Sequence, residues 1–578
     1  MIRVRCYLIL LLLSAGLLAG CQSSGVPAPA LSPFATSAPA TLTSAPTATS
    51  LPVTLVAPVT GLPVGTDRLP WWNDTVFYEI FVRSFYDSNG DGIGDLNGLI
   101  GKLDYLNDGN PATTADLGVT ALWLMPIHPS PLYHGYGVTD YYSVNPQYGT
   151  LDDFKRLLAE AHKRGIRIIL DLVLNHTSNE HPWFVVAQDP QSTYRDWYIW
   201  SPTDPGWTGP WGEQVWFAAD GGYYYGVFGS DMPDLNYTNS AVTEKMDDIV
   251  RFWLVDVGVD GFRLDAAKHL IEEGQVQENS DATLAWYQSF RPYYKGLSPL
   301  AITVGEVQGN SALVDEYLQG DGLDLAFDFD LAAAFIVSAR VGKADAVRRV
   351  LSADLAISRP FQFATFITNH DQNRVLSQLA GKPEKGRVAA TMLLTAPGVP
   401  FIYYGEEVGM LGLKPDEQIR TPMQWSSEQN GGFTTGTPWE PLQPDFAEGK
   451  NVAVETADAQ SLLSHYRALI RLRNEHAALR VGATALVDAS MPAIYALMRS
   501  NPGERLLTVV NLSGEPVRDY QLTLATGPLA AGSRYRAVPL MGAGPSADLT
   551  ANAGGGFDAY MPWPALPPYS SLILQLQN

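Results

Sequence analysis

Eight short apolar runs, each typical of a buried β-strand, recur along the chain from Trp71 onward. They are VFYEIFV (76–82), ALWLMPI (121–127), RIILDLVLNH (167–176), GFRLDAA (261–267), AITVGEV (301–307), LDLAFDF (323–329), FATFITNH (363–370) and FIYYGEE (401–407). Amphipathic stretches such as LDDFKRLLAEAHKRG (151–165) and TEKMDDIVRFWLVDVG (243–258) lie between several of them. Eight strand-then-helix units in series predict an α/β fold, a (β/α)8 TIM barrel.

Polar side chains stand where these predicted strands end, at positions that an apolar core would reject. They are Asp171, Asn175 and His176 in the third run, Arg263, Asp265, Lys268 and His269 at the fourth, Glu306 at the fifth, and His370 and Asp371 at the seventh. One buried aspartate is more often a structural hydrogen-bonding group. Recurrence at the same strand end indicates chemistry, because the C-terminal rim of such a barrel holds the active site.

Two of these carboxylates suit the cleavage of a glycosidic bond, which needs a nucleophile and a general acid that later acts as base. Asp265 and Glu306 lie on adjacent predicted strands, and a retaining enzyme holds its two carboxylates roughly 5–5.5 Å apart. Arg263, two residues before Asp265, points to the same side of the strand and favours the ionised carboxylate. Glu306 follows the apolar run ITVG, where a raised pKa would suit an acid.

The same residues resemble the conserved regions of the α-amylase family of glycoside hydrolases. The matching motifs are DLVLNH (171–176), GFRLDAAKH (261–269), VGEV (304–307) and FITNHD (366–371), in the family's order, with GVTALWLMPI (118–127) and GVPFIYYGEEVGM (398–410) as further matches. The resemblance covers about residues 71–480. It implies an inserted domain B at 177–240 and a barrel formed by 67–176 and 241–482.

The resemblance also implies a role for each matching residue. Asp265 is the expected nucleophile, Glu306 the acid and base, and Asp371 a third carboxylate that holds sugar hydroxyls. Arg263 would position the nucleophile. The residues expected to contact substrate are Tyr136, which would stack on the sugar, His176 and His370 on its hydroxyls, and Lys268 and His269 on the leaving side. Many relatives carry Asp where this chain has Gly137.

The stretch DSNGDGIGD (87–95) places oxygen-bearing side chains on alternate residues, as in the first part of a calcium-binding EF-hand loop. An EF-hand is excluded, because the twelfth position is Gly98 and the preceding segment is a predicted strand. A turn without metal is the plain alternative. The family resemblance implies structural Ca²⁺ held by Asp87, Asn89, Asp91, Asp95 and the carbonyl of Ile93. A second Ca²⁺, held by Asn175 and the His269 carbonyl, is implied with less support, because no ligand from domain B is identified.

The sequence contains motifs typical of α-1,4-specific enzymes and motifs typical of α-1,6-specific enzymes. MPDLN (232–236) resembles neopullulanases and intermediate α-amylases, whereas RTPMQW (420–425) resembles oligo-1,6-glucosidases. Ala266 stands where α-1,6-specific members tend to have Val, and the Lys268–His269 pair is typical of amylases. We therefore expect α-1,4 cleavage in starch and maltooligosaccharides. The alternatives are an α-1,6-glucosidase, a pullulan or cyclodextrin hydrolase, a transglycosylase, and a catalytically inactive sugar-binding scaffold, which the three retained carboxylates disfavour.

Composition is consistent with a sugar-binding protein. The net charge of −22 argues against nucleic acid, whose phosphates require Lys and Arg. The 14 Trp and 27 Tyr mostly fill cores, yet such rings also stack on pyranoses. After a helix expected at 461–479, alternating runs such as RLLTVVNLS (505–513) and SSLILQLQ (570–577) predict an antiparallel β-sandwich, domain C, at 483–578.

The N-terminus is typical of an exported protein. Arg3 and Arg5 precede an apolar run within residues 1–20, which indicates a signal peptide. The run ends in LAGC, which resembles a bacterial lipobox and implies lipidation of Cys21; an ordinary signal with a chance cysteine is the alternative. Residues 22–66 are rich in Pro, Ala, Thr and Ser and carry no charge, which predicts a disordered tether. We expect a monomeric cell-surface or periplasmic lipoprotein.

Overall fold

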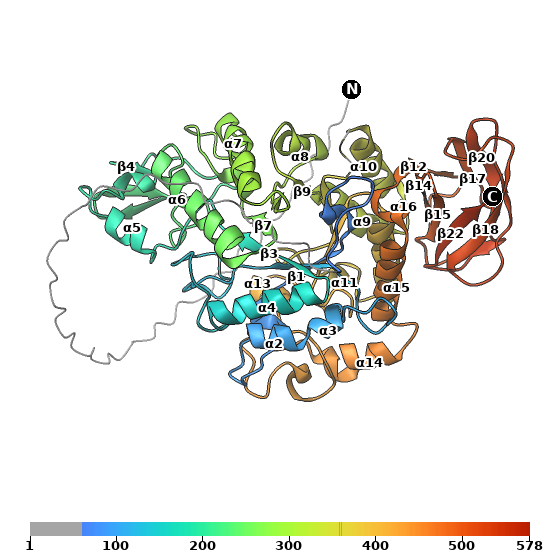
Figure 1. Ribbon diagram of the computed structural model, residues 1–578, viewed down its shortest axis with the longest axis horizontal. Helices are drawn as coiled ribbons and strands as arrows, with labels where there is room; N and C mark the ends of the chain where they lie inside the picture. Colours follow the sequence, from blue (N-terminus) through green and yellow to red (C-terminus); the bar gives the residue numbers. More distant parts are fainter. Residues whose placement is uncertain (1–60, 358, 360) are drawn as a thin grey trace, which may run out of the picture. The chain divides into compact units, whose positions relative to one another are not determined.

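The computed structural model describes residues 61–357, 359 and 361–578, and its core is a closed barrel of eight parallel strands (Figure 1). The strands are β1 (Phe77–Ile80), β2 (Ala121–Leu124), β3 (Arg167–Leu172), β7 (Gly261–Leu264), β8 (Ile302–Gly305), β9 (Leu325–Phe327), β10 (Phe363–Thr365) and β11 (Val399–Tyr403). Their order around the barrel follows the sequence, and β11 pairs with β1 to close it. The predicted (β/α)8 barrel is confirmed.

The barrel strands are mostly apolar because both of their faces are buried. Every residue of β1, β2, β3 and β7 is buried, as expected for a parallel sheet covered by helices. Aromatic rings fill the interior: Phe77 stacks on Phe401 with ring centroids 4.3 Å apart, and Trp123 lies 5.4 Å from Phe327. The third strand ends at Leu172, so that Asn175 and His176 lie in the loop beyond it.

Helices follow most of the strands and cover the outside of the barrel. The longer ones are α4 (Leu151–Lys163), α6 (Ser240–Arg251), α7 (Asp281–Leu297), α8 (Ser311–Leu318), α9 (Phe329–Val341), α10 (Asp345–Ala356), α12 (Pro383–Thr395) and α15 (Leu462–Glu475). A capping box between Thr150 and Asp153 starts α4. The segment expected as one helix over 243–258 is α6 continued by a π-helix, Phe252–Val257, which ends at Gly258 in the left-handed conformation.

The long connection between β3 and α6 carries a small sheet of its own. It contains α5 (Pro182–Ala187) and the antiparallel strands β4 (Trp200–Ser201), β5 (Trp216–Ala219) and β6 (Gly222–Tyr225), with β6 in the middle. Its aromatic cluster includes Trp216 and Tyr225, whose ring centroids lie 5.3 Å apart. We call this connection, residues 177–239, the insertion.

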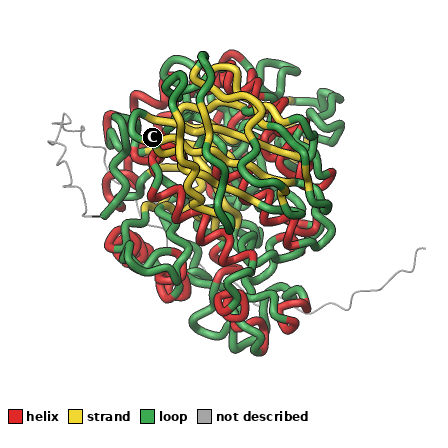
Figure 2. The backbone as a smooth tube through the Cα atoms, turned by 90° about the vertical axis from the view of Figure 1, so that its right-hand side faces the viewer, coloured by secondary structure: helices red, strands yellow, loops and turns green. Residues whose placement is uncertain are grey.

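The C-terminal segment is antiparallel, as predicted, and Figure 2 looks onto its strands, drawn in yellow. One sheet joins β12 (Ala483–Leu486), β14 (Ile494–Asn501), β15 (Glu504–Asn511), β22 (Ser571–Gln577), β18 (Arg534–Met541) and β19 (Leu549–Thr550); another joins β13 (Asp488–Ala489), β17 (Leu522–Thr526) and β20 (Gly555–Tyr560). A separate apolar core lies within this domain. Leu497, Val510 and Ile573 belong instead to the main core, so the larger sheet also packs against the barrel.

The expected signal peptide, the lipidated Cys21 and nearly all of the tether lie outside the described residues. Within residues 61–578, apart from the two undescribed positions 358 and 360, no helix has the length and apolarity needed to cross a bilayer.

Candidate active site

One buried arginine, Arg263, connects two of the predicted catalytic carboxylates at the C-terminal ends of the barrel strands. Nη1 of Arg263 donates to Oδ1 of Asp265 at 2.7 Å, and its Nη2 donates to Oε2 of Glu306 at 2.8 Å. The same Nη1 also lies 2.8 Å from Oδ1 of Asp171. The ends of β3, β7 and β8 therefore bring three carboxylates to one guanidinium, which supplies the charge-assisted bonds that hold them together.

The turn after β7 fixes Glu306 from a second direction. Ala266 has φ 49°, in the left-handed region, which a non-glycine residue adopts only at a cost of order 1–3 kcal/mol. In this conformation its amide donates to Oε2 of Glu306 at 3.0 Å. Because Oε2 accepts two N–H groups, a proton on this carboxyl belongs on Oε1.

A second network runs through His370 and Tyr136, two of the residues predicted to contact the sugar. Its Nε2 lies 2.6 Å from the hydroxyl of Tyr136, which donates to Asp171 at 2.9 Å. Its Nδ1 lies 2.5 Å from Oε1 of Glu79, a buried residue of β1. The rings of Tyr136 and His370 stack 5.5 Å apart. The two side chains are thus held as one rigid wall of the site.

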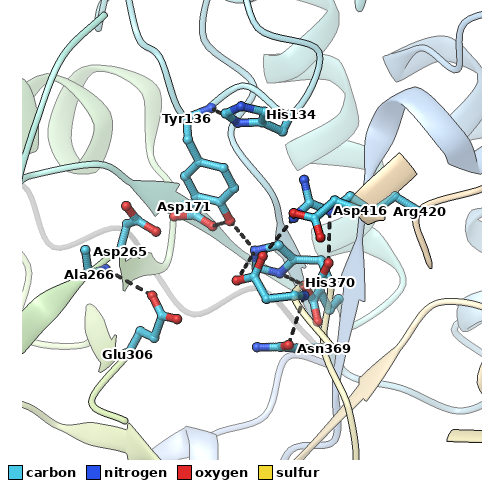
Figure 3. Close-up of polar contacts among 12 residues, drawn as sticks. His134, Tyr136, Asp171, Asp265, Ala266, Glu306, Asn369, His370, Asp416 and Arg420 are labelled. Carbon is cyan, nitrogen blue, oxygen red and sulfur yellow. Dashed lines mark hydrogen bonds and ion pairs between the residues drawn. The ribbon is translucent and has the colours of Figure 1, made fainter. Parts of the chain in front are cut away.

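Asp371 is held by two cations at the rim. Nη2 of Arg420 donates to its Oδ1 at 2.7 Å, and Nε2 of His370 lies 3.1 Å from its Oδ2. Nε of Arg420 also donates to the His370 carbonyl at 2.9 Å, so the arginine fixes both residues (Figure 3). The Asp371 side chain is 41% exposed, which leaves it accessible to a ligand.

Burial and neighbouring charges separate the pKa values of these groups. Burial raises the pKa of Asp265 and that of Glu306, and in both cases it outweighs the opposing effect of Arg263. The pKa of Asp371 is held far below its usual value, because the charges of His370 and Arg420 overcome burial. Asp371 and Glu79 in turn raise the pKa of His370 to about 10 against its burial, so this imidazole is a cation.

The remaining predicted contact residues border the same rim. His176 is buried, and burial lowers its pKa to about 4, which keeps the imidazole neutral. Lys268 donates to Glu278 at 2.5 Å. Nδ1 of His269 lies 3.0 Å from the Gln277 carbonyl. Lys268 and His269 leave β7 on the short 3-10 turn that follows Asp265.

The predicted calcium loop, residues 87–95, is an ordered series of side-chain-to-backbone turns. The side chain of Asp87 accepts from the backbone amides of Asn89 and Gly90. The side chain of Asn89 accepts from the Asp91 amide, and that of Asp91 accepts from the Ile93 amide. Asp95 caps α2 (Leu96–Gly101) by accepting from the Gly98 amide at 2.7 Å. The candidate metal ligands are oxygen atoms at the predicted spacing, as Ca²⁺ requires. Most of these oxygens already accept hydrogen bonds from the loop itself. Among the described residues, no three His, Cys, Asp or Glu side chains are placed to hold a metal ion.

A second cluster of oxygens lies under the insertion, beside Asn175. Nδ2 of Asn175 donates to Oδ2 of Asp234 at 3.0 Å, while its Oδ1 is buried and accepts no bond from any described residue. Burial raises the pKa of Asp234 to about 8, and Glu272 next to it has a pKa raised well above its usual value, first by burial and then by Asp234. An orphaned amide oxygen beside two buried carboxyls fits a divalent cation.

Sequence reasoning gave no role to Glu79, Asp171, Asp234, Glu272 or Arg420. Glu79 is the one charged residue of the run VFYEIFV (76–82), and Arg420 begins the motif RTPMQW (420–425), but neither position indicated a contact in the site. Asp171 was identified at its strand end but given no role. Asp234 lies inside the quoted motif MPDLN, and its position in that motif was the only available signal.

The chain is similar to known proteins over most of its length. The sequence profile of the family described as alpha amylase, catalytic domain, matches residues 79–482. Alpha-amylase 3 of Dictyoglomus thermophilum is 41% identical over 452 residues, covering 77% of this chain and 86% of the relative. An oligo-1,6-glucosidase of Parageobacillus thermoglucosidasius is 33% identical over 519 residues, covering 77% and 90%.

The solved structures include an alpha-amylase from H. orenii, which is 42% identical to this chain with a TM-score of 0.74 and covers 87% of this chain and 99% of its own. That match extends beyond the barrel, and the profile match alone spans more than half of the sequence. The chain therefore belongs to the α-amylase family of glycoside hydrolases.

Proposed function

We propose that the protein is a retaining, endo-acting α-amylase that cleaves α-1,4-glucosidic bonds in starch and maltooligosaccharides. The observation that carries the mechanism is the Arg263 guanidinium, which bonds Asp265 through one nitrogen and Glu306 through the other. The specificity is supported by 41% and 42% identity to two proteins named as α-amylases.

In the first step a carboxylate oxygen of Asp265 attacks C1 of the sugar. The bond from C1 to the glycosidic oxygen breaks, and that oxygen takes the proton from Oε1 of Glu306. Burial favours the protonated form of Glu306 by raising its pKa. Arg263 favours ionised Asp265 and keeps the attacking carboxylate in place through the 2.7 Å bond.

In the second step water takes the place of the leaving sugar. Glu306, now a carboxylate, accepts a proton from the water as the oxygen forms its bond to C1. The bond between C1 and Asp265 breaks, and Asp265 leaves as a carboxylate. Two displacements at C1 return the α-configuration.

Asp371, Tyr136, His176 and His370 would contact the sugar under attack. The network of His370 supports this role, because it fixes Tyr136 and Asp371 relative to each other. Preorganised groups act at no cost at the moment of reaction, which is the main source of electrostatic catalysis.

An α-1,6-glucosidase is the second candidate, favoured by RTPMQW and by 33% identity to an oligo-1,6-glucosidase. Digests of soluble starch, maltotetraose, isomaltose and pullulan, followed by chromatography of the products, separate the two functions. We expect rapid shortening of starch and little release of glucose from isomaltose. Preferential hydrolysis of isomaltose would refute the α-1,4 assignment.

We also propose that Ca²⁺ stabilises the fold at two places. Asp87, Asn89, Asp91, Asp95 and the Ile93 carbonyl would hold one ion, and the regular turns of the loop support it. The second site would use Asn175, the His269 carbonyl, Asp234 and Glu272; there the buried carboxyls and the orphaned amide oxygen support it. A bound ion would neutralise these carboxylates and take no part in the chemistry.

Export as a lipoprotein stays a proposal that rests on the sequence alone. The site before Cys21 and the uncharged tether support it. Membrane fractions of the expressing cell should contain the wild-type enzyme, and Cys21→Ser should move it to the soluble fraction or leave the signal uncleaved. A freely secreted wild type without lipid would refute it.

A further inference from the structure

The indole ring of Trp211, in the insertion, is exposed, unlike the rings of the other described tryptophans. It is 57% exposed, whereas every other tryptophan of the described residues is buried or half-buried. Leaving an indole in water forgoes about 25 cal/mol for each Å² of apolar surface. A single exposed ring needs no explanation on its own, so its surroundings decide whether it has a function.

The ring of Trp211 ends a row of aromatic rings that begins in the active site. Its centroid lies 5.3 Å from the ring of His269 and 5.9 Å from that of Phe228. Phe228 lies 5.6 Å from His269 and 5.3 Å from His176. The row runs from the buried His176, just beyond β3, to the exposed indole, and its contacts fix the position of Trp211.

His269, which the ring of Trp211 contacts, lies near the acid, Glu306. His269 follows Asp265 by four residues on the turn after β7. Glu306 is among the nearby charges that raise the pKa of His269, against the lowering caused by its burial. In the proposed mechanism the leaving sugar takes its proton from Glu306, so the chain on the leaving side extends toward His269 and then Trp211.

We propose that Trp211 is a stacking platform for a glucose unit on the leaving side of the cleaved bond, and thereby sets the balance between transfer to a sugar and hydrolysis. This inference rests on the proposed function. The indole offers an apolar face to the C–H face of a pyranose, and the contacts to His269 and Phe228 reduce the entropy cost of holding it there.

The platform acts in both chemical steps. In the first, it binds the unit that departs and so favours long substrates. In the second, it retains an incoming oligosaccharide whose hydroxyl oxygen attacks C1 in place of water. The hydroxyl proton goes to Glu306, the bond from C1 to Asp265 breaks, and a new glycosidic bond forms. Water and sugar thus compete for one intermediate, and Trp211 contacts only the sugar.

The test compares substrates that differ on the leaving side. Maltotetraose places glucose units there, whereas α-glucosyl fluoride places only a fluoride ion. The variants are Trp211→Ala, which removes the ring, Trp211→Phe, which keeps an aromatic face, and Leu300→Ala. Leu300 is a matched control: it is 60% exposed and lies just before β8, at the opposite end of that strand from Glu306.

For Trp211→Ala we expect kcat/KM on maltotetraose to fall about tenfold, the loss of one aromatic contact, and the loss on α-glucosyl fluoride to be several times smaller. With α-glucosyl fluoride as donor and maltose as acceptor, the ratio of transfer product to glucose should fall by a similar factor. Trp211→Phe should restore most of both effects, and Leu300→Ala should match the wild type in both.

The outcomes separate this inference from the proposed function. Equal losses on maltotetraose and on α-glucosyl fluoride, or no loss on either, would overturn the platform while the hydrolase assignment stands. An unchanged ratio of transfer to hydrolysis in Trp211→Ala would overturn the role of Trp211 in the second step, while the hydrolase assignment stands. A wild type that turns over neither substrate would overturn the proposed function itself.

Discussion

Replacing Glu306 by Gln tests the acid and base role with little change of shape. In the wild type Oε2 of Glu306 accepts from Arg263 at 2.8 Å and from the Ala266 amide at 3.0 Å. The amide oxygen of a glutamine can take this place and keep both bonds. Its NH₂ group then stands at the position of Oε1, where the wild type carries the proton that the leaving sugar needs.

The expected loss follows from that single change. General acid–base catalysis contributes about 10²–10⁴-fold, which equals roughly 3–5 kcal/mol of barrier. We expect kcat/KM of Glu306→Gln on maltotetraose to fall by this factor. On α-glucosyl fluoride, whose leaving group needs little acid, Asp265 should still be glycosylated. The reaction should then stall, because water lacks a base.

Sodium azide provides the decisive assay, since an azide ion attacks C1 without needing a base. In Glu306→Gln it should release the stalled sugar as α-glucosyl azide, observed by NMR. With Asp265→Ala no intermediate can form, and azide can enter only from the opposite face to give the β-azide. Glu406→Gln is a matched control, because Glu406 is a buried carboxyl that bonds Tyr466, outside the reacting network.

Equal losses of Glu306→Gln on both substrates, with no product restored by azide, would show that Glu306 is structural. Formation of α-azide by Asp265→Ala would exclude Asp265 as the nucleophile. Wild-type products that appear first as β-anomers would exclude double displacement altogether.

Three further outcomes follow from the same geometry. The kcat/KM profile should be bell-shaped, with an acid limb where Asp265 takes up its proton and an alkaline limb where Glu306 loses its own; burial raises both pKa values, so both limbs should lie at higher pH than for exposed carboxyls. Chelation should lower the melting temperature, because calcium at a hundred times its dissociation constant stabilises the folded protein by about 2.7 kcal/mol. Asp91→Ala should weaken this calcium response. A melting curve insensitive to both calcium and chelator would contradict the prediction. Arg420→Lys should lower kcat about 10–100-fold, with a smaller effect on KM, because one ammonium group cannot replace the guanidinium bonds to both Asp371 and the His370 carbonyl. An unchanged kcat would exclude a positioning role.

The barrel could be predicted because its signal is local and repeated. Each strand is a short apolar run, and Asp265 and Glu306 directly follow two of these strands, where they break the apolar pattern. The parallel register of β7 and β8 then brings the two ends together. The strand boundaries were less predictable: β3 ends at Leu172, four residues before the end of the run RIILDLVLNH (167–176) from which it was predicted.

The partners of these residues could not be predicted, because they come from distant parts of the chain. Glu79 lies 291 residues from His370, and Arg420 lies 49 residues after Asp371 in a segment without a strand pattern. Asp234 lies 59 residues from Asn175. Glu79 breaks an apolar run just as Asp265 does, but the sequence does not show which distant residue such a carboxylate, or an arginine in a loop, will contact.

The charges of the site explain why these distant partners are needed. Six carboxylates, Glu79, Asp171, Asp265, Glu306, Asp371 and Asp416, lie among four cations, Arg263, His370, Arg420 and Lys414. With all carboxylates ionised the site would carry an excess charge of −2, which buried groups avoid by holding a proton. In the proposed mechanism Glu306 holds one proton, which lowers the excess to −1. The transition state of glycoside cleavage resembles an oxocarbenium cation, and this remaining negative charge stabilises it. The same imbalance thus keeps the acid protonated before the reaction and stabilises the positive charge that develops when the proton leaves.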